Sequence, residues 1–481
     1  MQGFAEQAVQ AALSAGASYA DARFVRRRAE SVRVKNGSPE ALTSGRDRGL
    51  GLRVIADGAC GFAATGELWP ADVRTTARRA VELAHAAATT TREPVRLAEV
   101  EPAVDEVRPR VEIDPADVPL EDRLALLLAC DREMQREDLA VAEGYVNVVR
   151  EEQQFVSSEG ACVHQERVET GAGLEATAAN AAETQRRSYP ASHGGQMMAR
   201  GYEVVQELGL LEHAAEIAEQ AVRLLDAPQC PSGEMDVILT GGQLALQLHE
   251  SCGHPIELDR VLGTEASYAG TSFLSPDKLG SFRYGSEHVN ITADATLDGG
   301  LGSFGYDDEG VPAQRADIVK DGIFVGYLTS RETAATLGLP SNGTMRADGW
   351  QRLPLIRMTN INLEPGDMTL QEIIATTERG VMMANNRSWS IDDKRLNFQF
   401  GAEVGRLIED GEIVGIVRNP TYTGITPQFW NSCDAVADAD SWVIWGVPNC
   451  GKGEPGQAAH VGHGVSAARF RNVRVGVLGD E

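Results

Sequence analysis

The stretch Asp226-Ala227-Pro228-Gln229-Cys230-Pro231 separates two parts of the sequence whose apolar patterns differ. Two prolines in four residues end the helical pattern before them and are typical of a connection between domains. The chain has 481 residues, a length that favours two or three domains over one. We therefore predict an N-terminal domain over residues 1–228 and a C-terminal domain over residues 229–481.

The part before this stretch alternates helix and hairpin patterns. Apolar residues recur at helical spacing over residues 73–84, 120–128 and 205–222, and each series predicts one helix with a buried face. The dipeptides Asn36-Gly37 and Asp57-Gly58 favour the positive φ angles that tight hairpins need. These patterns predict an antiparallel sheet with helices packed on it.

Short alternating segments dominate the part after the stretch. Turn dipeptides such as Asp321-Gly322 and Asp410-Gly411 flank segments in which apolar and polar residues alternate, as over residues 322–328. Few helices are expected, one over residues 243–252 and one over residues 370–379. We therefore predict an α+β protein whose C-terminal domain is strand-rich, in the form of a sandwich or a barrel.

The composition excludes several classes of function. The chain carries 44 Lys and Arg against 70 Asp and Glu, a formal net charge of −26 that repels phosphate groups, so direct binding to nucleic acid or an anionic membrane is not expected. No apolar run approaches the ~18 residues that span a bilayer. Seven thinly spread cysteines argue against a secreted disulfide framework. The sequence predicts a cytoplasmic protein with free thiols.

The segment Leu248-His249-Glu250-Ser251-Cys252-Gly253-His254 carries the most informative chemistry. In the H-E-x-x-H pattern of zinc hydrolases, the histidines lie about 40° apart around a helix and the glutamate activates water. Here His254 follows His249 by five positions, which corresponds to about 140° on a regular helix. We predict that the helix widens into a π turn or ends at Gly253, so that both imidazoles reach one metal ion.

A catalytic zinc usually has three protein ligands and one open position. Cys450 is a candidate for the third ligand, because it lies in a glycine-rich loop and the nearby Lys452 would favour its ionised form. The alternatives are Cys252, Glu257 and the pair His460 and His463. The spacing of these residues does not choose among them.

Other polar residues receive a simpler interpretation. The run Asp307-Asp308-Glu309 is interpreted as a solvated turn. The run Asn385-Asn386-Arg387 fits either an ordinary polar loop or a site that binds a peptide main chain. No function is assigned to the isolated histidines His85, His164, His193, His213 and His288.

Four stretches of the C-terminal part resemble the TldD/PmbA family of peptidases, and specifically its metal-bearing TldD-type member. They are His249-Glu250-x-x-x-His254, Tyr306-Asp307-Asp308-Glu309-Gly310-Val311-Pro312, Ile356-Arg357-Met358-Thr359-Asn360 and Asn449-Cys450-Gly451-Lys452. The resemblance implies a zinc peptidase in which His249, His254 and Cys450 hold the metal and Glu250 is the general base. Ligation by imidazole and thiolate together also favours zinc over other metals.

The resemblance also implies a substrate and partners. It implies hydrolysis of short or unfolded peptides inside a chamber formed by two subunits, either a homodimer or a heterodimer with a PmbA-type relative. The alternative is a non-catalytic interaction protein that modulates a partner such as DNA gyrase, a role also described for the family. A scaffold of that kind would not require the ligand set together with Glu250.

Overall fold

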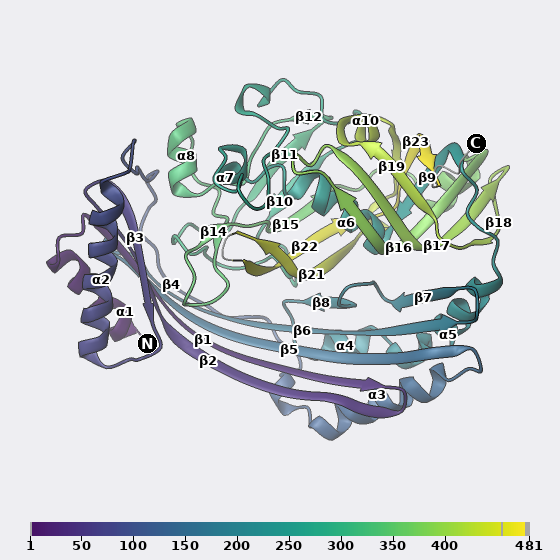
Figure 1. The fold of residues 1–481 in the computed structure, drawn as a ribbon, viewed down its shortest axis with the longest axis horizontal. Coiled ribbons are helices and arrows are strands. Elements are labelled where there is room, and N and C mark those ends of the chain that lie inside the picture. The colour runs from purple at the N-terminus through teal and green to yellow at the C-terminus, as the bar shows by residue number, and fades with distance from the viewer. Residues whose placement is uncertain (1, 454–455, 477–481) are drawn as a thin grey trace.

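The computed structural model describes residues 2–453 and 456–476 and has an α+β architecture, with 24% of the residues in helices and 42% in strands. Met1 of the predicted first domain, and residues 454–455 and 477–481 of the predicted second, lie outside this description. The predicted fold class is confirmed, since a helix-covered antiparallel sheet precedes a strand-rich part (Figure 1). The division at residue 228 stays a prediction. Within the described ranges, no helix has both the length and the apolar composition to cross a bilayer.

One long, curved sheet dominates the first part of the chain (Figure 1). Its strands are β1 (Tyr19–Lys35), β2 (Ser38–Ala56), β3 (Ala59–Thr65), β4 (Val104–Val107), β5 (Leu139–Ser157), β6 (Cys162–Ala179), β7 (Thr184–Tyr189) and β8 (Gln196–Met198). The order across the sheet is β3-β2-β1-β5-β6-β4, and β7 and β8 both pair with β6. Asn36 and Asp57 have φ values of 46° and 50° at the first two turns, so these predicted hairpins are confirmed.

Helices cover this sheet on its outer side and at one end (Figure 1). They are α1 (Gln2–Ser14), α2 (Pro70–Ala88), the 3-10 turn η1 (Pro115–Asp117), α3 (Leu120–Met134), α4 (Glu203–Glu207) and α5 (Leu210–Asp226). The apolar faces of α1 and α2 pack on β1 and β2, while those of α3, α4 and α5 pack on β5 and β6. The single helix predicted over residues 205–222 is wrong, because Gly209 adopts a φ of 56° and separates α4 from α5.

A closed barrel of five strands forms the centre of the second part. These strands are β9 (Gly233–Thr240), β16 (Arg379–Ile391), β17 (Asn397–Glu409), β19 (Thr421–Ile425) and β23 (Ala468–Val475). The ring closes because β16 pairs with both β9 and β17, and β23 pairs with both β9 and β19. Two further strands, β18 (Glu412–Val417) and β20 (Cys433–Val436), extend it at β17 and β23.

A second sheet lies beside the barrel. In spatial order it consists of β12 (Ile323–Phe324), β11 (Arg315–Lys320), β10 (Ile291–Asp294), β15 (Asn360–Leu363), β22 (Gln457–Val465) and β21 (Val443–Lys452). A small pair is formed by β13 (Met345–Arg346) and β14 (Leu355–Ile356). Strand β21 is therefore an edge strand of the larger sheet, with β22 as its ladder partner.

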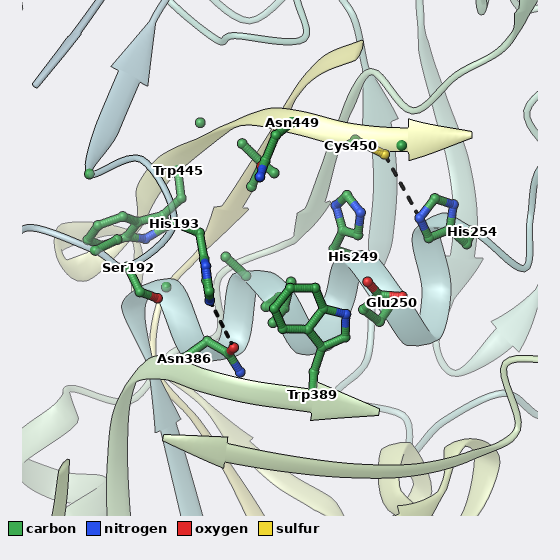
Figure 2. A pocket seen from close by; sticks show the side chains of 18 of the residues that line it. Ser192, His193, His249, Glu250, His254, Asn386, Trp389, Trp445, Asn449 and Cys450 are labelled. Carbon is green, nitrogen blue, oxygen red and sulfur yellow. Dashed lines mark hydrogen bonds between the residues drawn. The ribbon is translucent and has the colours of Figure 1, made fainter. Parts of the chain in front are cut away.

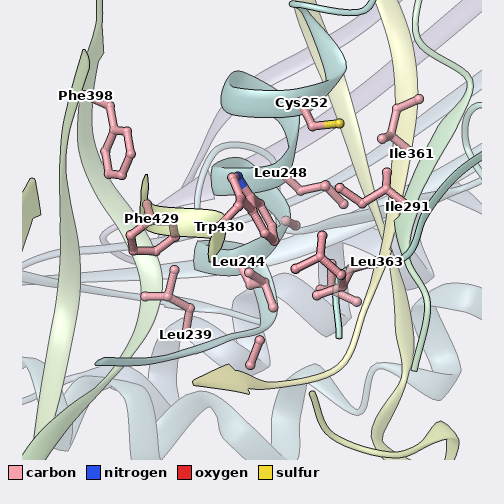
Figure 3. Close-up of a cluster of buried hydrophobic side chains, with 14 of the residues drawn as sticks. Leu239, Leu244, Leu248, Cys252, Ile291, Ile361, Leu363, Phe398, Phe429 and Trp430 are labelled. Atoms are coloured by element: carbon pink, nitrogen blue, oxygen red, sulfur yellow. The ribbon is translucent and has the colours of Figure 1, made fainter. Parts of the chain in front are cut away.

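Helix α6 (Gly241–Leu248) lies between the barrel and this second sheet (Figure 1). Its fully buried Leu244 and Leu248 belong to one apolar core with barrel residues such as Phe398 and sheet residues such as Ile291 and Ile361 (Figure 3). Truncating a buried leucine in such a core costs about 2–5 kcal/mol, so the position of α6 is strongly fixed.

The remaining helices of this part are short. They are the π turn η2 (His249–Gly253), α7 (Leu258–Val261), the 3-10 turn η3 (Pro276–Lys278), α8 (Arg331–Leu337), α9 (Leu370–Ala375), α10 (Thr426–Asn431) and the 3-10 turn η4 (Ala439–Ser441). The helix predicted over residues 370–379 is shorter than expected, because the chain enters β16 at Arg379.

Buried ion pairs join the two parts of the chain. Nη1 of Arg23 lies 2.9 Å from Oδ2 of Asp308, and Nη1 of Arg53 lies 2.6 Å from Oε1 of Glu309. All four side chains are less than one-tenth exposed. The third carboxylate of the run, Asp307, accepts hydrogen bonds from the backbone N–H groups of three residues. The interpretation of residues 307–309 as a solvated turn is therefore wrong, because arginines from the first sheet and backbone donors satisfy these buried carboxylates.

Candidate metal centre

The helix that carries the two motif histidines is widened as predicted. After α6, residues His249–Gly253 form a π turn, in which the N–H of His254 donates to the carbonyl oxygen of His249 at 3.2 Å. The additional residue in the turn brings the imidazoles together, with ring centroids 4.9 Å apart and planes at 88°. The π turn ends at Gly253, so both features of the prediction are present. Gly253 also allows close packing, since a Cβ at this position would lie 2.3 Å from Sδ of Met358.

Cys450 approaches the two histidines from the distant strand β21. Its Sγ lies 3.9 Å from Nε2 of His254, and donor atoms of His249, His254 and Cys450 all lie within 4.8 Å of one another (Figure 2). The β21–β22 register shifts between Val447 and Cys450, and this bulge sets the direction of the cysteine side chain. All three side chains are buried.

The alternative ligands considered from the sequence make other contacts. Cys252 belongs to the apolar core, where burial raises the pKa of its thiol to about 12. Glu257 contacts Nδ1 of His254, and His463 contacts Nδ1 of His249. His460 points elsewhere, with Nδ1 2.6 Å from a carboxylate oxygen of Glu169.

A chain of hydrogen bonds fixes the tautomer of His249. Nδ1 of His463 lies 3.2 Å from the carbonyl oxygen of Ile361, which can only accept, so this nitrogen carries the proton. Burial lowers the pKa of both His463 and His249, which favours neutral rings. Nε2 of His463 then accepts a hydrogen bond from Nδ1 of His249 at 2.8 Å. The Nε2 lone pair of His249 is consequently left free for a metal.

The second imidazole is oriented by a carboxylate. Nδ1 of His254 lies 3.1 Å from Oε2 of the fully buried Glu257. Glu257 in turn contacts Arg260 at 3.4 Å and Lys452 at 3.4 Å, so its buried charge is compensated. This arrangement leaves Nε2 of His254 facing Cys450, and carboxylate–histidine pairs of this kind are common behind metal-binding imidazoles.

The surroundings of Cys450 favour its thiolate. Burial raises the pKa of the thiol, but the nearby His254 and Arg357 outweigh burial, so that the pKa lies below its usual value. The predicted effect of Lys452 on this thiol is wrong, because the Lys452 ammonium is bound to Asp259 at 2.7 Å. Arg357 donates to the carbonyl oxygen of Cys450 and is the relevant cation.

These donors fit a zinc ion by their chemistry. Two neutral imidazole nitrogens and one thiolate are typical zinc ligands, and three protein ligands leave one position open. A second group of potential ligands, formed by Glu152, His164 and Glu166, is half-buried on the first sheet. Its Glu152 is already paired with Arg26, so the buried centre is the better candidate.

Glu250 lies beside the donors at the wall of a cavity of about 270 Å³ (Figure 2). Trp389 from β16 and Trp445 from β21 line the same cavity, and the loop over residues 191–195 reaches it from the first part of the chain. Oε2 of Glu250 lies 2.5 Å from Nη1 of Arg395, which also lines the cavity. The carboxylate is therefore placed to contact a molecule that enters beside the three donors.

The sequence did not reveal the role of every residue at the site. Arg395 lines the cavity but lies far from the motif along the chain, and no spacing connects the two. His463 was considered only as an alternative metal ligand, and its contact with His249 was not predicted. His193, to which no function was assigned, lines the cavity with its Nε2 3.3 Å from Oδ1 of Asn386. Asn386 donates to the carbonyl oxygens of Ser388 and Gly401 in its own hairpin. A motif search reports local spacing and could not reveal these long-range contacts.

Models of one protein family match most of the chain in three consecutive segments. The PmbA/TldA metallopeptidase domain 1 matches residues 20–84, the central domain matches residues 113–225 and the C-terminal domain matches residues 232–477. The chain belongs to the PmbA/TldD metallopeptidase family.

Individual relatives agree with this assignment. A metalloprotease of Methanothermobacter thermautotrophicus is 31% identical, over 95% of this chain and 95% of its own length. A zinc metalloprotease TldD homolog of Saccharolobus solfataricus is 28% identical, over 54% of this chain and 56% of its own length. Family membership and these names support a metal-dependent, metallopeptidase-type function.

A solved structure supports the fold. A Thermotoga maritima protein, proposed to modulate a DNA gyrase, superposes with a TM-score of 0.77 at 20% identity. The match covers 98% of this chain and 99% of that chain, so the whole architecture is shared.

Proposed function

We propose that the chain is a zinc-dependent peptidase that hydrolyses short or unfolded peptides, with Glu250 as the general base. The observation that carries the proposal is the meeting of His249, His254 and Cys450 beside Glu250 at one cavity wall. Each donor is buried, and each imidazole has a partner that directs its Nε2 toward the same point. A structural metal site would not require a carboxylate and a cavity beside it.

Each residue of the site has a separate role in the proposed reaction. His249, His254 and Cys450 would hold zinc, which when bound lowers the pKa of water toward ~7 and polarises a carbonyl group. Glu250 accepts a proton from the attacking water and later delivers it to the leaving amine. His463 and Glu257 keep the two imidazoles in the required tautomers.

The shape of the site supports extended peptides as substrates. β21 is an edge strand of its sheet, and the side chain of Gln196 already occupies the carbonyl oxygen of Ile444 and the N–H of Gly446. The segment from Val447 to Asn449 lines the cavity farther along this strand. A peptide can add to such an edge through its main chain, which gives low side-chain selectivity and excludes folded proteins.

Assembly and location are also part of the proposal. We infer a dimer, with an identical subunit or a PmbA-type relative, whose chamber encloses the cavity; the family resemblance supports this. All seven cysteines are free, which is typical of a reducing compartment such as the cytoplasm. Light scattering of the full-length protein, alone and mixed with a PmbA-type relative, tests the assembly.

The test compares wild-type protein with Glu250→Gln and His249→Ala. Full-length proteins loaded with zinc are analysed for metal content and for cleavage of a mixture of unstructured peptides by mass spectrometry. We expect one zinc per chain and cleavage in the wild type, and loss of zinc in His249→Ala. Glu250→Gln should keep zinc, but its kcat should fall about 10²–10⁴-fold because the general base is absent.

The exposed Glu287 provides the matched control, and Glu287→Gln should retain wild-type activity. Wild-type cleavage rates in zinc-loaded Glu250→Gln would overturn the role of Glu250. A zinc-loaded wild type that cleaves none of the peptides would overturn the peptidase proposal.

A further inference from the structure

Arg395 occupies an unusual position in the hairpin turn between β16 and β17. Its N–H donates to the carbonyl oxygen of Asp392 at 2.8 Å, and its φ is 63°, a left-handed conformation that glycine or asparagine usually adopts. The turn is fixed from outside, because the N–H groups of Thr271 and Phe273 donate to the carbonyl oxygens of Asp393 and Lys394. Surrounding structure therefore holds an arginine where the local backbone does not favour one.

The guanidinium of Arg395 has unused hydrogen-bonding capacity. Nη1 contacts Glu250, while Nε is buried and has no hydrogen-bond partner in the described part of the chain. The side chain is 17% exposed, so it is largely screened from solvent but still reaches the cavity. Because the side chain lines the cavity, an N–H group of the guanidinium other than the one bonded to Glu250 can contact an oxygen atom of a ligand.

Other nearby cations are committed elsewhere. Arg357 bonds carbonyl oxygens of Cys450 and Gln457, and Arg260 contacts Glu257. Lys452 is held by Asp259 and Glu257. Among the described residues that line the cavity, Arg395 is the one arginine or lysine. It is thus the positive charge available to a substrate beside Glu250.

We propose that Arg395 is a catalytic residue that donates hydrogen bonds to the carbonyl oxygen of the scissile peptide bond and to the oxyanion formed from it. This inference rests on the proposed peptidase function. Because the guanidinium has five N–H donors, Arg395 can retain one contact with Glu250 while another N–H binds the carbonyl oxygen. The pairing with Glu250 thereby places the base and the oxyanion donor on the same reacting group.

The proposed reaction has two steps, addition of water and release of the amine. Water oxygen forms a bond to the carbonyl carbon, the C=O π electrons move to the oxygen that Arg395 binds, and Glu250 takes the water proton. The C–N bond then breaks as the oxyanion electrons re-form a C=O bond, and the amine nitrogen takes the proton from Glu250. Arg395 supplies no proton, and its contribution is to stabilise the negative oxygen.

The test uses Arg395→Asn in zinc-loaded, full-length protein. Asparagine tolerates the left-handed conformation, so the turn can fold without the guanidinium. We expect unchanged zinc content, little change in KM and a kcat lower by about 10²–10³-fold. A phosphinic peptide, whose negative oxygen resembles the oxyanion, should lose affinity by a similar factor. Lys394→Asn alters the exposed neighbouring cation and should change none of these values.

Three outcomes would overturn the inference. Wild-type kcat and inhibitor affinity with a lower Tm would give Arg395 a structural role. A loss confined to peptides with a free C-terminal carboxylate, relative to amidated peptides, would make it a carboxylate-binding residue. A lower kcat with undiminished phosphinic-peptide affinity would exclude an oxyanion contact. If zinc-loaded wild type cleaved no peptide, the proposed function itself would fail, which the variant comparison distinguishes.

Discussion

At the residue scale, His463 shows how a buried side chain that is not itself a metal ligand can fix the tautomer of a ligand. It accepts a hydrogen bond from His249 and donates one to the carbonyl oxygen of Ile361. The resulting tautomer presents Nε2 of His249 to the candidate metal position. Glu257 orients the imidazole of His254 in the same way, through a contact with its Nδ1.

Replacing His463 by leucine should weaken zinc binding about 10–100-fold, because the N–H of His249 loses its acceptor and the ring loses its orientation. Competition with a zinc-binding dye at fixed pH measures the affinity. His288→Leu, at an exposed histidine, is the control and should bind zinc like the wild type. Equal zinc affinity in His463→Leu and wild type would contradict the assigned role.

The sequence predicts residues that are local to the motif better than distant ones. The spacing of His249 and His254 indicated a shared metal site, whereas the choice of Cys450 required the family resemblance. Arg395 was missed because its contact with Glu250 joins residues separated by 145 positions. The carboxylates of residues 307–309 were misinterpreted because their arginine partners lie on the first sheet.

At the element scale, the π turn explains how two histidines five positions apart can face one point. The wide turn is accommodated where Gly253 packs directly on the fully buried Met358. The spacing alone predicted a distorted helix, but it did not distinguish a π turn from a helix end. That choice depends on tertiary packing. The break at Gly209 depends on the left-handed conformation of that glycine, which the apolar periodicity did not reveal.

Gly253→Ala should lower the free energy of unfolding by about 1–3 kcal/mol and weaken zinc binding, since the new Cβ overlaps Met358. Met358→Ala alone should cost about 2–5 kcal/mol by leaving a cavity. The double variant should be destabilised by less than the sum, because the new methyl group enters space that the shortened side chain vacates. Urea unfolding measures all three.

Gly415→Ala serves as the control, since no atom lies within 4 Å of the added Cβ and the unfolding free energy should not fall. Strict additivity of Gly253→Ala and Met358→Ala would show that this packing contact does not constrain the π turn.

At the scale of the whole molecule, buried charges connect the long sheet to the strand-rich part. Glu403 of β17 accepts hydrogen bonds from Arg187 and from the N–H of Ser188. Oε2 of Glu169 on β6 lies 2.6 Å from Nδ1 of His460 on β22. The alternation of elements predicted the fold class correctly, but the relative placement of the two parts depends on these long-range pairs.

Glu169 should make stability pH-dependent in acid. Burial raises the pKa of its carboxyl, but His460 and Arg167 outweigh burial and bring the pKa from 4.5 to about 2. The stabilisation is therefore complete above pH 4.5 and is lost as the pH falls toward 2. The difference between the two pKa values corresponds to roughly 3 kcal/mol.

Glu169→Gln should therefore be less stable than wild type at pH 6, and the difference should shrink steadily between pH 4.5 and pH 2. Urea unfolding across this range measures it, with the exposed Glu137→Gln as the control. A stability difference that is constant with pH would contradict the assigned ionisation.

The most direct measurement for the whole account is zinc X-ray absorption on the zinc-loaded, full-length protein. The account predicts two nitrogen neighbours at about 2.0–2.1 Å and one sulfur neighbour at about 2.3 Å. The sulfur should disappear in Cys450→Ser and remain in Cys252→Ser. A wild-type spectrum without sulfur, or a sulfur neighbour that persists in Cys450→Ser, would contradict the proposed centre.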